Sequence, residues 1–431
     1  MENSNKSSSE PSGMRSLGAV LFVQAQNAFN DNFVRFVLMG LAMAVASGTV
    51  LGDKIQFILS ILITLPFILL APIAGYFSDR FSKQSVIWWC AVAQFGLFVF
   101  IGGCVWFRQI EFAIVGFFLL AVQSTIFSPA KQGILKEIVG TQKLGFANGL
   151  LSMLTMVGIL AGMIFSGRWF DHLLRGYNEA SGVNSENVWK AALIPILGIG
   201  LFSLTALIGT KMIQKTPEHP SEKFSRSIWV RHFVHLRQLF QQPILRRTAL
   251  FITAYWFIAN SLFFFFVAFA KKIYPNVQQA GLSSAIGEMM VAVGGGLIIG
   301  SLLVSFISRK RIILKLCIFG AFGMALGLLA VGIVEPGITL WYGCLGVIGF
   351  SSAFYIVPLN AHLQDQADPE SRGRVISAMN LMTSIAAVIA TGIGIVLDLK
   401  LEPSQQVLVF VVPTVLVGIF ITLAQKSLPV A

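Results

Sequence analysis

The chain has 431 residues, of which 55% are hydrophobic and only 12% are charged. Soluble domains carry about 25% charged residues, so the composition excludes an ordinary soluble enzyme and indicates a membrane protein with many spans. The net charge of +12 does not indicate a nucleic-acid-binding protein, because most of the 31 lysines and arginines fall in the predicted loops of one side. No nucleophile–base set, nucleotide-binding loop or metal-ligand spacing is present in the sequence, so we expect no enzyme activity, cofactor or metal.

A membrane-spanning helix needs about 20 apolar residues, and the sequence contains twelve such runs. The predicted spans are 17–46, 55–76, 86–106, 111–131, 144–166, 191–212, 247–270, 284–307, 312–334, 337–362, 375–398 and 406–425. They predict an all-α membrane protein with twelve transmembrane helices in two pseudo-symmetric six-helix halves.

The halves are residues 17–212 and 247–431, preceded by a polar tail at 1–16 and separated by a basic central loop at 213–246. Cytoplasmic loops are rich in lysine and arginine, so the cation distribution predicts that both termini and the central loop are cytoplasmic. The part 228–240 of that loop has the pattern of an amphipathic helix on the membrane surface. The segment 167–190 is expected to be the longest outer loop.

Polar residues interrupt the first apolar run. Gln24, Asn27, Asp31 and Arg35 fall on one face of a helix with 3.6 residues per turn. Charged groups at membrane depth are costly and generally face a bundle interior or a wet cavity. Asp31 and Arg35 could simply neutralise each other as an (i, i+4) pair, but the amides on the same face favour a polar substrate cavity.

The fourth predicted span ends in Phe127-Ser-Pro-Ala-Lys131. Lys131 has two readings: it faces the cavity and pairs with Asp31, or it extends to the cytoplasmic interface as long cationic side chains do. The sequence alone leaves both open.

The two halves resemble each other weakly, because in each a proline-containing span end is followed by a short loop and an asparagine in the next span. Corresponding interruptions in two repeats point to a transport site. Asn148, Asn360 and Asn380 are therefore candidate cavity residues, although Asn148 and Asn380 are equally suited to hydrogen bonds between helices. Glu288 is, besides Asp31, a candidate proton carrier, unless it lies at the outer mouth.

The loop after the second span reads Gly75-Tyr-Phe-Ser-Asp79-Arg80-Phe-Ser-Lys83. It resembles the Gly-x3-Asp-Arg-x2-Lys/Arg signature of the major facilitator superfamily. A glycine permits close helix contact, and the acid can bind a neighbouring helix end. Gly75, Asp79, Arg80 and Lys83 are therefore expected to form a latch that holds one conformation.

Within this superfamily the chain resembles the bacterial lysophospholipid transporters. The resemblance rests on Asn30-Asp-Asn32, on Phe127-Ser-Pro-Ala-Lys-Gln-Gly-Ile-Leu135, on Ala147-Asn-Gly149 and on Val357-Pro-Leu-Asn-Ala-His-Leu-Gln364. It implies inward flipping of lysophospholipids such as lysophosphatidylethanolamine across the bacterial inner membrane, with Asp31 and Lys131 in the polar cavity. The family's arginine in the seventh span is replaced here by the phenylalanines of 263–266.

The sequence thus predicts a secondary transporter that works by alternating access on an amphiphile, as a monomer in the bilayer. The resemblance implies that the amphiphile is a lysophospholipid and that a separate acyltransferase acts alongside the transporter. Two alternatives remain at this point. One is a proton-coupled exporter of drugs or siderophore-like molecules, and the other is a membrane scaffold or receptor that transports nothing.

Overall fold

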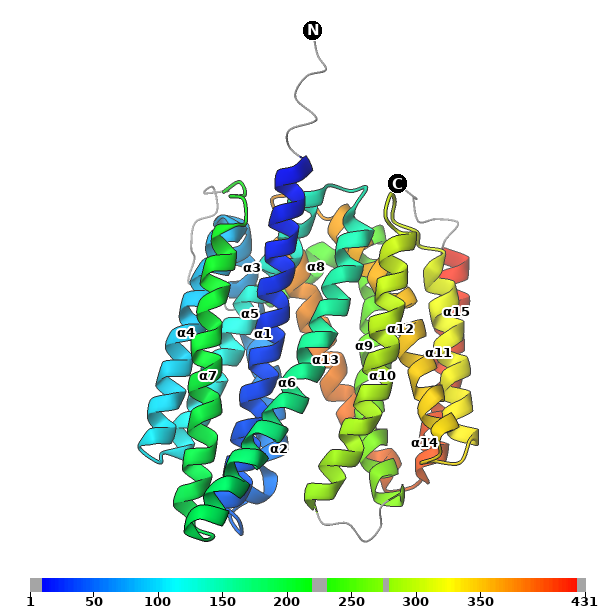
Figure 1. The fold of residues 1–431 in the computed structure, drawn as a ribbon. Coiled ribbons are helices and arrows are strands. Elements are labelled where there is room, and N and C mark those ends of the chain that lie inside the picture. The colour runs from blue at the N-terminus through cyan, green and yellow to red at the C-terminus, as the bar shows by residue number, and fades with distance from the viewer. Residues whose placement is uncertain (1–9, 219–230, 274–278, 425–431) are drawn as a thin grey trace. The chain divides into compact units, whose positions relative to one another are not determined.

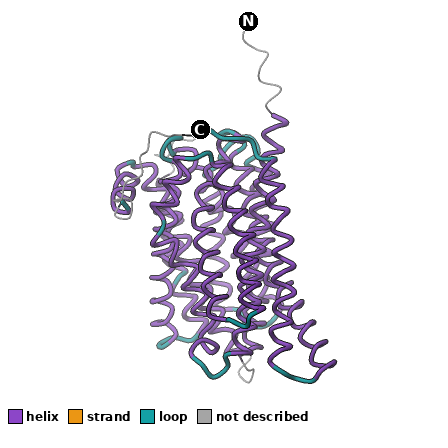
Figure 2. Tube along the Cα trace, turned by 90° about the vertical axis from the view of Figure 1, so that its left-hand side faces the viewer, coloured by secondary structure: helices purple, strands orange, loops and turns teal. Residues whose placement is uncertain are grey.

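The structure is a computed structural model, and it describes residues 10–218, 231–273 and 279–424. In these ranges every secondary-structure element is an α-helix, and mostly short loops connect the helices (Figure 2). In a bilayer every backbone N–H and C=O must be satisfied within the protein, and a helix does this within one segment. The predicted all-α membrane fold is confirmed.

The helices follow the predicted spans closely and are labelled in Figure 1. They are α1 (Glu10–Val45), α2 (Val50–Leu69), α3 (Ala71–Arg80), α4 (Lys83–Trp106), α5 (Ile110–Val139), α6 (Leu144–Ser181), α7 (Ser185–Lys211), α8 (His232–Gln241), α9 (Pro243–Ile273), α10 (Gln279–Ile307), α11 (Leu316–Ile333), α12 (Thr339–Gln366), α13 (Arg372–Asp398), α14 (Pro403–Val409) and α15 (Val411–Ala424). Among the described residues, eleven segments are long and apolar enough to cross a membrane, and the bent pair α2–α3 makes twelve when it counts as one span.

The second span was predicted as one continuous helix, and this is wrong. Its two parts, α2 and α3, meet at Leu70 with a bend of 58° between them. Pro66 lies inside α2 and Pro72 at the start of α3. Proline lacks an N–H and its ring clashes with the carbonyl of the preceding turn, so two prolines around Leu70 account for the break.

The fourth span was predicted to end near Lys131, but α5 continues to Val139 with Pro129 inside it. In the same way α12 runs through Pro358 to Gln366. Membrane helices tolerate an internal proline where neighbouring groups satisfy the freed carbonyl. The prolines therefore lie within these helices and do not end them.

The long outer loop predicted at 167–190 is also wrong. Helix α6 continues to Ser181, and α7 begins at Ser185 after a turn at Gly182 whose φ is +76°. Asn184 caps α7 by accepting a hydrogen bond from the N–H of Asn187. The drop in hydropathy after residue 166 marks the end of the apolar part of α6, but its helix extends further. Of the predicted amphipathic segment 228–240, residues 228–230 lie outside the described residues, Arg231 is in a turn, and 232–240 lie in α8.

The described chain forms two compact units. Unit 1 comprises α1 to α5 up to Ile138, α6 from Val157, α7 and the segment Glu370–Ser377 at the start of α13. Unit 2 comprises the first part of α6 up to Met156, α8 from Val234 onward, α9 to α12, and the rest of the described chain from Ala378. Each unit therefore contains a short segment from the opposite six-helix half of the sequence.

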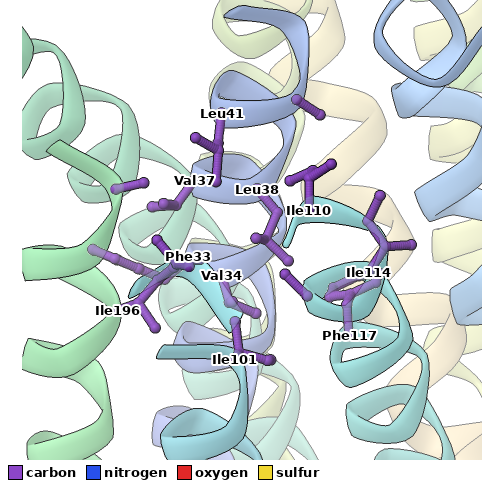
Figure 3. Close-up of a cluster of buried hydrophobic side chains, with 14 of the residues drawn as sticks. Phe33, Val34, Val37, Leu38, Leu41, Ile101, Ile110, Ile114, Phe117 and Ile196 are labelled. Carbon is purple, nitrogen blue, oxygen red and sulfur yellow. The ribbon is translucent and has the colours of Figure 1, made fainter. Parts of the chain in front are cut away.

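The core of unit 1 is centred on the second half of α1, where Phe33, Val37 and Leu41 are buried against Ile101 of α4 and Ile196 of α7 (Figure 3). In unit 2 a second core forms around α9 and α12, with Phe265, Phe269 and Trp341 buried together.

Glycines set the approach of α6 to α1. A Cβ on Gly158 would meet the backbone oxygen of Ala25, and one on Gly162 would meet that of Phe29. Small residues four apart allow backbones to approach closely in membranes. This close glycine-mediated contact fixes the face of α1 that points away from α6.

Candidate polar cavity

Asp31 lies at the centre of a cluster of polar side chains in unit 1. Its Oδ2 accepts hydrogen bonds from Ser124 Oγ at 2.6 Å and from Asn27 Nδ2 at 2.9 Å. The Oδ1 of Asn27 in turn accepts from Gln94 Nε2 at 3.0 Å and from Gln123 Nε2 at 3.3 Å. The cluster thus joins α1, α4 and α5.

The second carboxylate oxygen of Asp31 is not used. Among the residues that the structure describes, its Oδ1 is buried and has no hydrogen-bond partner. An acceptor that is buried without a partner costs about 1–3 kcal/mol, and more when it is charged. A donor that reaches this oxygen, from water or from a bound molecule, removes this cost.

Arg35 lies one turn beyond Asp31 on α1, and the two do not neutralise each other. Arg35 donates to Ser60 Oγ of α2 at 2.7 Å, and no ion pair joins it to Asp31 within the described ranges. Gln24 is buried on the same side of α1, two turns before Asp31. The predicted face of α1 therefore carries an acid and a cation that have separate partners.

Lys131 lies on the same side of α5 as Ser124, two helical turns further along. Its ammonium is 5.2 Å from the centre of the Phe127 ring, which is a cation–π contact. Lys131 and Asp31 attract each other electrostatically but are not within ion-pair distance. Since α5 continues beyond Lys131, this residue lies inside the helix and not at its end.

The three candidate asparagines lie in unit 2. Asn148 and Gln364 form a buried, reciprocal pair of amide hydrogen bonds at 3.0 and 2.9 Å between α6 and α12. Asn360 and Asn380 are half-buried. The geometry of Asn148 fits the interhelical hydrogen-bonding alternative, since its amide is engaged by Gln364. Glu288 is exposed on α10 and accepts a hydrogen bond from Tyr342 at 3.2 Å.

The signature segment makes a second set of contacts in unit 1. The carboxylate of buried Asp79 accepts hydrogen bonds from the backbone N–H groups of Gly373 at 2.6 Å and Arg374 at 3.0 Å, and from the Arg374 Nε at 3.1 Å. These N–H groups belong to the first turn of α13, which has no other partner for them within the helix. Asp79 thus caps the N-terminus of α13, a helix that is distant from it in the sequence.

Gly75 provides the space for this contact, because a Cβ there would lie 3.0 Å from the Cα of Arg374. The other two signature residues, Arg80 and Lys83, contact side chains outside α13. Arg80 donates to the Tyr76 hydroxyl at 2.7 Å, and Lys83 forms an ion pair with Glu137 of α5 at 2.6 Å. Of the four predicted latch residues, two therefore meet α13 directly.

Several residues of these sites were not identified from sequence. Glu137 forms the ion pair with Lys83 and a second ion pair, at 3.5 Å, with Arg372 at the start of α13. Ser124, Gln123 and Gln94 complete the cluster around Asp31. Isolated amides in apolar spans were the available signal, but a single glutamine does not show which face of its helix meets α1.

Comparisons with known proteins agree with this fold. The sequence profile of the Major Facilitator Superfamily matches residues 20–391. A lysophospholipid transporter of Klebsiella pneumoniae is 27% identical over 380 residues, which cover 87% of each chain, and one of Pectobacterium carotovorum is 26% identical over 392 residues, 88% of this chain and 86% of the relative.

Solved structures with the same fold include the fucose:proton symporter of Escherichia coli, at 14% identity and a TM-score of 0.72 over 96% of this chain and 99% of the symporter. A bacterial homologue of the iron transporter ferroportin has 17% identity and a TM-score of 0.68 over 94% of this chain and 99% of that homologue. At these identities the structures establish the fold alone.

Proposed function

Because the chain belongs to the major facilitator superfamily and is a secondary transporter, we propose that it moves a lysophospholipid across the bacterial inner membrane by alternating access. The observation that carries the proposal is the buried, unpartnered Oδ1 of Asp31 in the middle of a membrane span. An ammonium donor satisfies it, and a lysophosphatidylethanolamine headgroup has one.

Two cations of unit 1 complement this acid. Lys131 is held by an aromatic ring, and Arg35 is held by a serine hydroxyl. Neither has an acid within ion-pair distance in the described part of the chain. A zwitterionic headgroup therefore has an acid for its ammonium and a cation for its phosphate. The named activity of the 26–27% identical relatives supports the same substrate class.

The contact of Asp79 with α13 supplies the conformational part of the proposal. It joins the signature segment of the first six-helix half to the start of the eleventh span, which belongs to the second half. Alternating access requires such contacts to break in one state, so the latch acts on one state only. We also propose that the transporter works as a monomer, delivers its substrate to a separate acyltransferase, and uses Asp31 and not Glu288 for any proton coupling.

The test of substrate class is binding and uptake. We expect lysophosphatidylethanolamine to raise the melting temperature of the detergent-purified protein, because a ligand that binds only the folded state stabilises it. Spheroplasts that carry the protein should take up the labelled lysolipid. Stabilisation by soluble amphiphilic drugs with no response to lysolipids favours the exporter, and no response to either class favours a scaffold or receptor.

Topology is a separate prediction, since we propose that both termini are cytoplasmic. After replacement of the four native cysteines, Glu218→Cys after α7 should be labelled by an impermeant maleimide from the cytoplasmic face only. Val183→Cys, in the turn after α6, is 90% exposed and should be labelled from the outer face only. Labelling of both positions from the same face contradicts the arrangement.

A further inference from the structure

Aromatic side chains of α1, α6 and α7 enclose a pocket of about 230 Å³ on the surface of unit 1. It is lined by Phe29, Phe33, Phe165, Trp169, Phe202 and Gly198. The rings form a connected set, with Phe29 5.9 Å from Phe202 and Phe33 6.0 Å from Trp169 between ring centres. Engineered apolar cavities of about 150 Å³ already bind benzene, so the volume suffices for part of an acyl chain.

The pocket is separate from the polar cavity. Phe29 and Phe33 lie one turn apart on α1, whereas Asp31, two residues from each, points about 160–200° away at 100° per residue. The side chain of Phe165 is 60% exposed and that of Phe202 is 41% exposed. The pocket is wholly apolar, open and near the end of the apolar part of α6, so lipid chains that reach the edge of the hydrocarbon layer are the apolar molecules best placed to enter it.

The absence of a side chain at position 198 keeps the pocket open. A Cβ on Gly198 would lie 2.7 Å from the Trp169 ring. A larger residue there would occupy part of the pocket and would have to displace the Trp169 ring, which also lines it.

A cation neighbours two pocket residues along α6, because Arg168 directly precedes Trp169 and follows Phe165 by three positions. Phe165, Arg168, Trp169 and His172 fall within about 100° of one another around α6. Arg168 is exposed and, among the described residues, has no ion-pair or hydrogen-bond partner. It lies about 36 Å along α6 from Leu144, beyond the hydrocarbon thickness of about 30 Å. The nearest acid in sequence, Asp171, points further round the helix.

We propose that this pocket binds one acyl chain of an anionic bilayer phospholipid, whose phosphate is held by Arg168. Arginine is suited to phosphate because its planar donors can form two parallel hydrogen bonds. The acyl chain then lies against Phe29 and Phe202. The headgroup lies at the level of Trp169, since tryptophans are common at the depth of lipid headgroups. Such a lipid contacts α1, which is also the helix that carries Asp31.

The test uses the full-length protein in nanodiscs of phosphatidylcholine doped with phosphatidylglycerol that carries a diazirine on one acyl chain. After illumination and proteolysis, mass spectrometry should find adducts in the peptides that contain Phe165 and Phe202. Unlabelled phosphatidylglycerol should compete, and further phosphatidylcholine should not. Adducts spread evenly over the lipid-facing helices, or equal competition by both lipids, overturn the proposal.

Two variants sharpen this test. Arg168→Gln removes a charge-assisted contact and should lower specific labelling about tenfold. Lys271→Gln, which removes an exposed cation at the end of α9 in unit 2, is the matched control and should label as the unaltered protein does. Gly198→Val should abolish labelling by filling the pocket. Equal labelling of Arg168→Gln and Lys271→Gln rejects the headgroup contact, and full labelling of folded Gly198→Val rejects the pocket. If Gly198→Val fails to fold, the competition result on the unaltered protein still decides.

Discussion

Asp31→Asn is expected to reduce lysolipid uptake about 10- to 100-fold, because a charge-assisted hydrogen bond contributes about 1.5–3 kcal/mol. The substitution preserves the shape of the side chain, and its carbonyl oxygen still accepts from Ser124 Oγ. What it removes is the negative charge and the acceptor at Oδ1. Transport should therefore fall while the amount of folded protein is unchanged, measured as uptake in spheroplasts at matched expression.

Lys131 decides whether the acid and the cation act on one headgroup. Lys131→Gln alone should also lower uptake, and the double substitution should be less than additively worse, because residues that share a ligand are energetically coupled. The exchange of Asp31→Lys with Lys131→Asp should not restore transport, since a zwitterion would meet reversed charges. If the two single losses are strictly additive, Lys131 does not share a headgroup with Asp31, and its alternative role at the membrane interface is favoured.

Asn32→Ala is the control for both experiments. Asn32 follows Asp31 on α1, but its amide donates to the backbone oxygen of Ala28 in the preceding turn and to no other group in the described part of the chain. Its loss should leave uptake close to that of the unaltered protein. A large loss in Asn32→Ala indicates that any change in this part of α1 damages folding, and that the effect of Asp31→Asn is not specific to the headgroup.

The fold could be predicted from the sequence because hydropathy and span length are properties of each segment alone. The errors were at positions where the tertiary environment decides. Pro129 and Pro358 lie inside their helices and do not end them, which membrane helices tolerate when other groups satisfy the freed backbone. Pro66 and Pro72, acting together, break the second span. The sequence pattern of a proline in an apolar run is the same in both cases.

The polar face of α1 could be recognised because an acid and several amides interrupt an apolar run at helical spacing. Its partners could not, since they come from α4 and α5 and depend on how those helices are rotated. Glu137 is the clearest example: in sequence it is one more charged residue near a span end, yet it binds Lys83 and lies near Arg372. Contacts across more than 200 residues are not encoded in local spacing.

The second prediction with a large expected effect concerns the proposed latch, the contact of Asp79 with the start of α13. Asp79→Ala is expected to shift the balance between conformational states about 5- to 150-fold, the range of a coupling of about 1–3 kcal/mol, and to lower transport accordingly. The substitution removes the acceptor of two backbone N–H groups of α13 together with the ion pair to Arg374. These contacts exist only when α3 and the start of α13 are together, so their loss favours states in which they are apart.

Spin labels at Phe81→Cys and Glu370→Cys, two exposed positions that flank the contact, report this change as a distance distribution. In Asp79→Ala a longer distance should gain population at the expense of the short one. Unchanged distances together with normal transport mean that the contact does not hold any state.

Arg374→Gln separates the two parts of the contact. It removes the ion pair but keeps both N–H groups that Asp79 binds. The Arg374 side chain is 19% exposed, and water weakens ion pairs that it can reach, whereas a helix cap contributes about 1 kcal/mol. Arg374→Gln should therefore shift the distances less than Asp79→Ala does. An equal shift would assign the latch to the ion pair. A smaller shift assigns it to the helix N-terminus, for which the acid at position 79 and the glycine at position 75 are the two requirements in the signature.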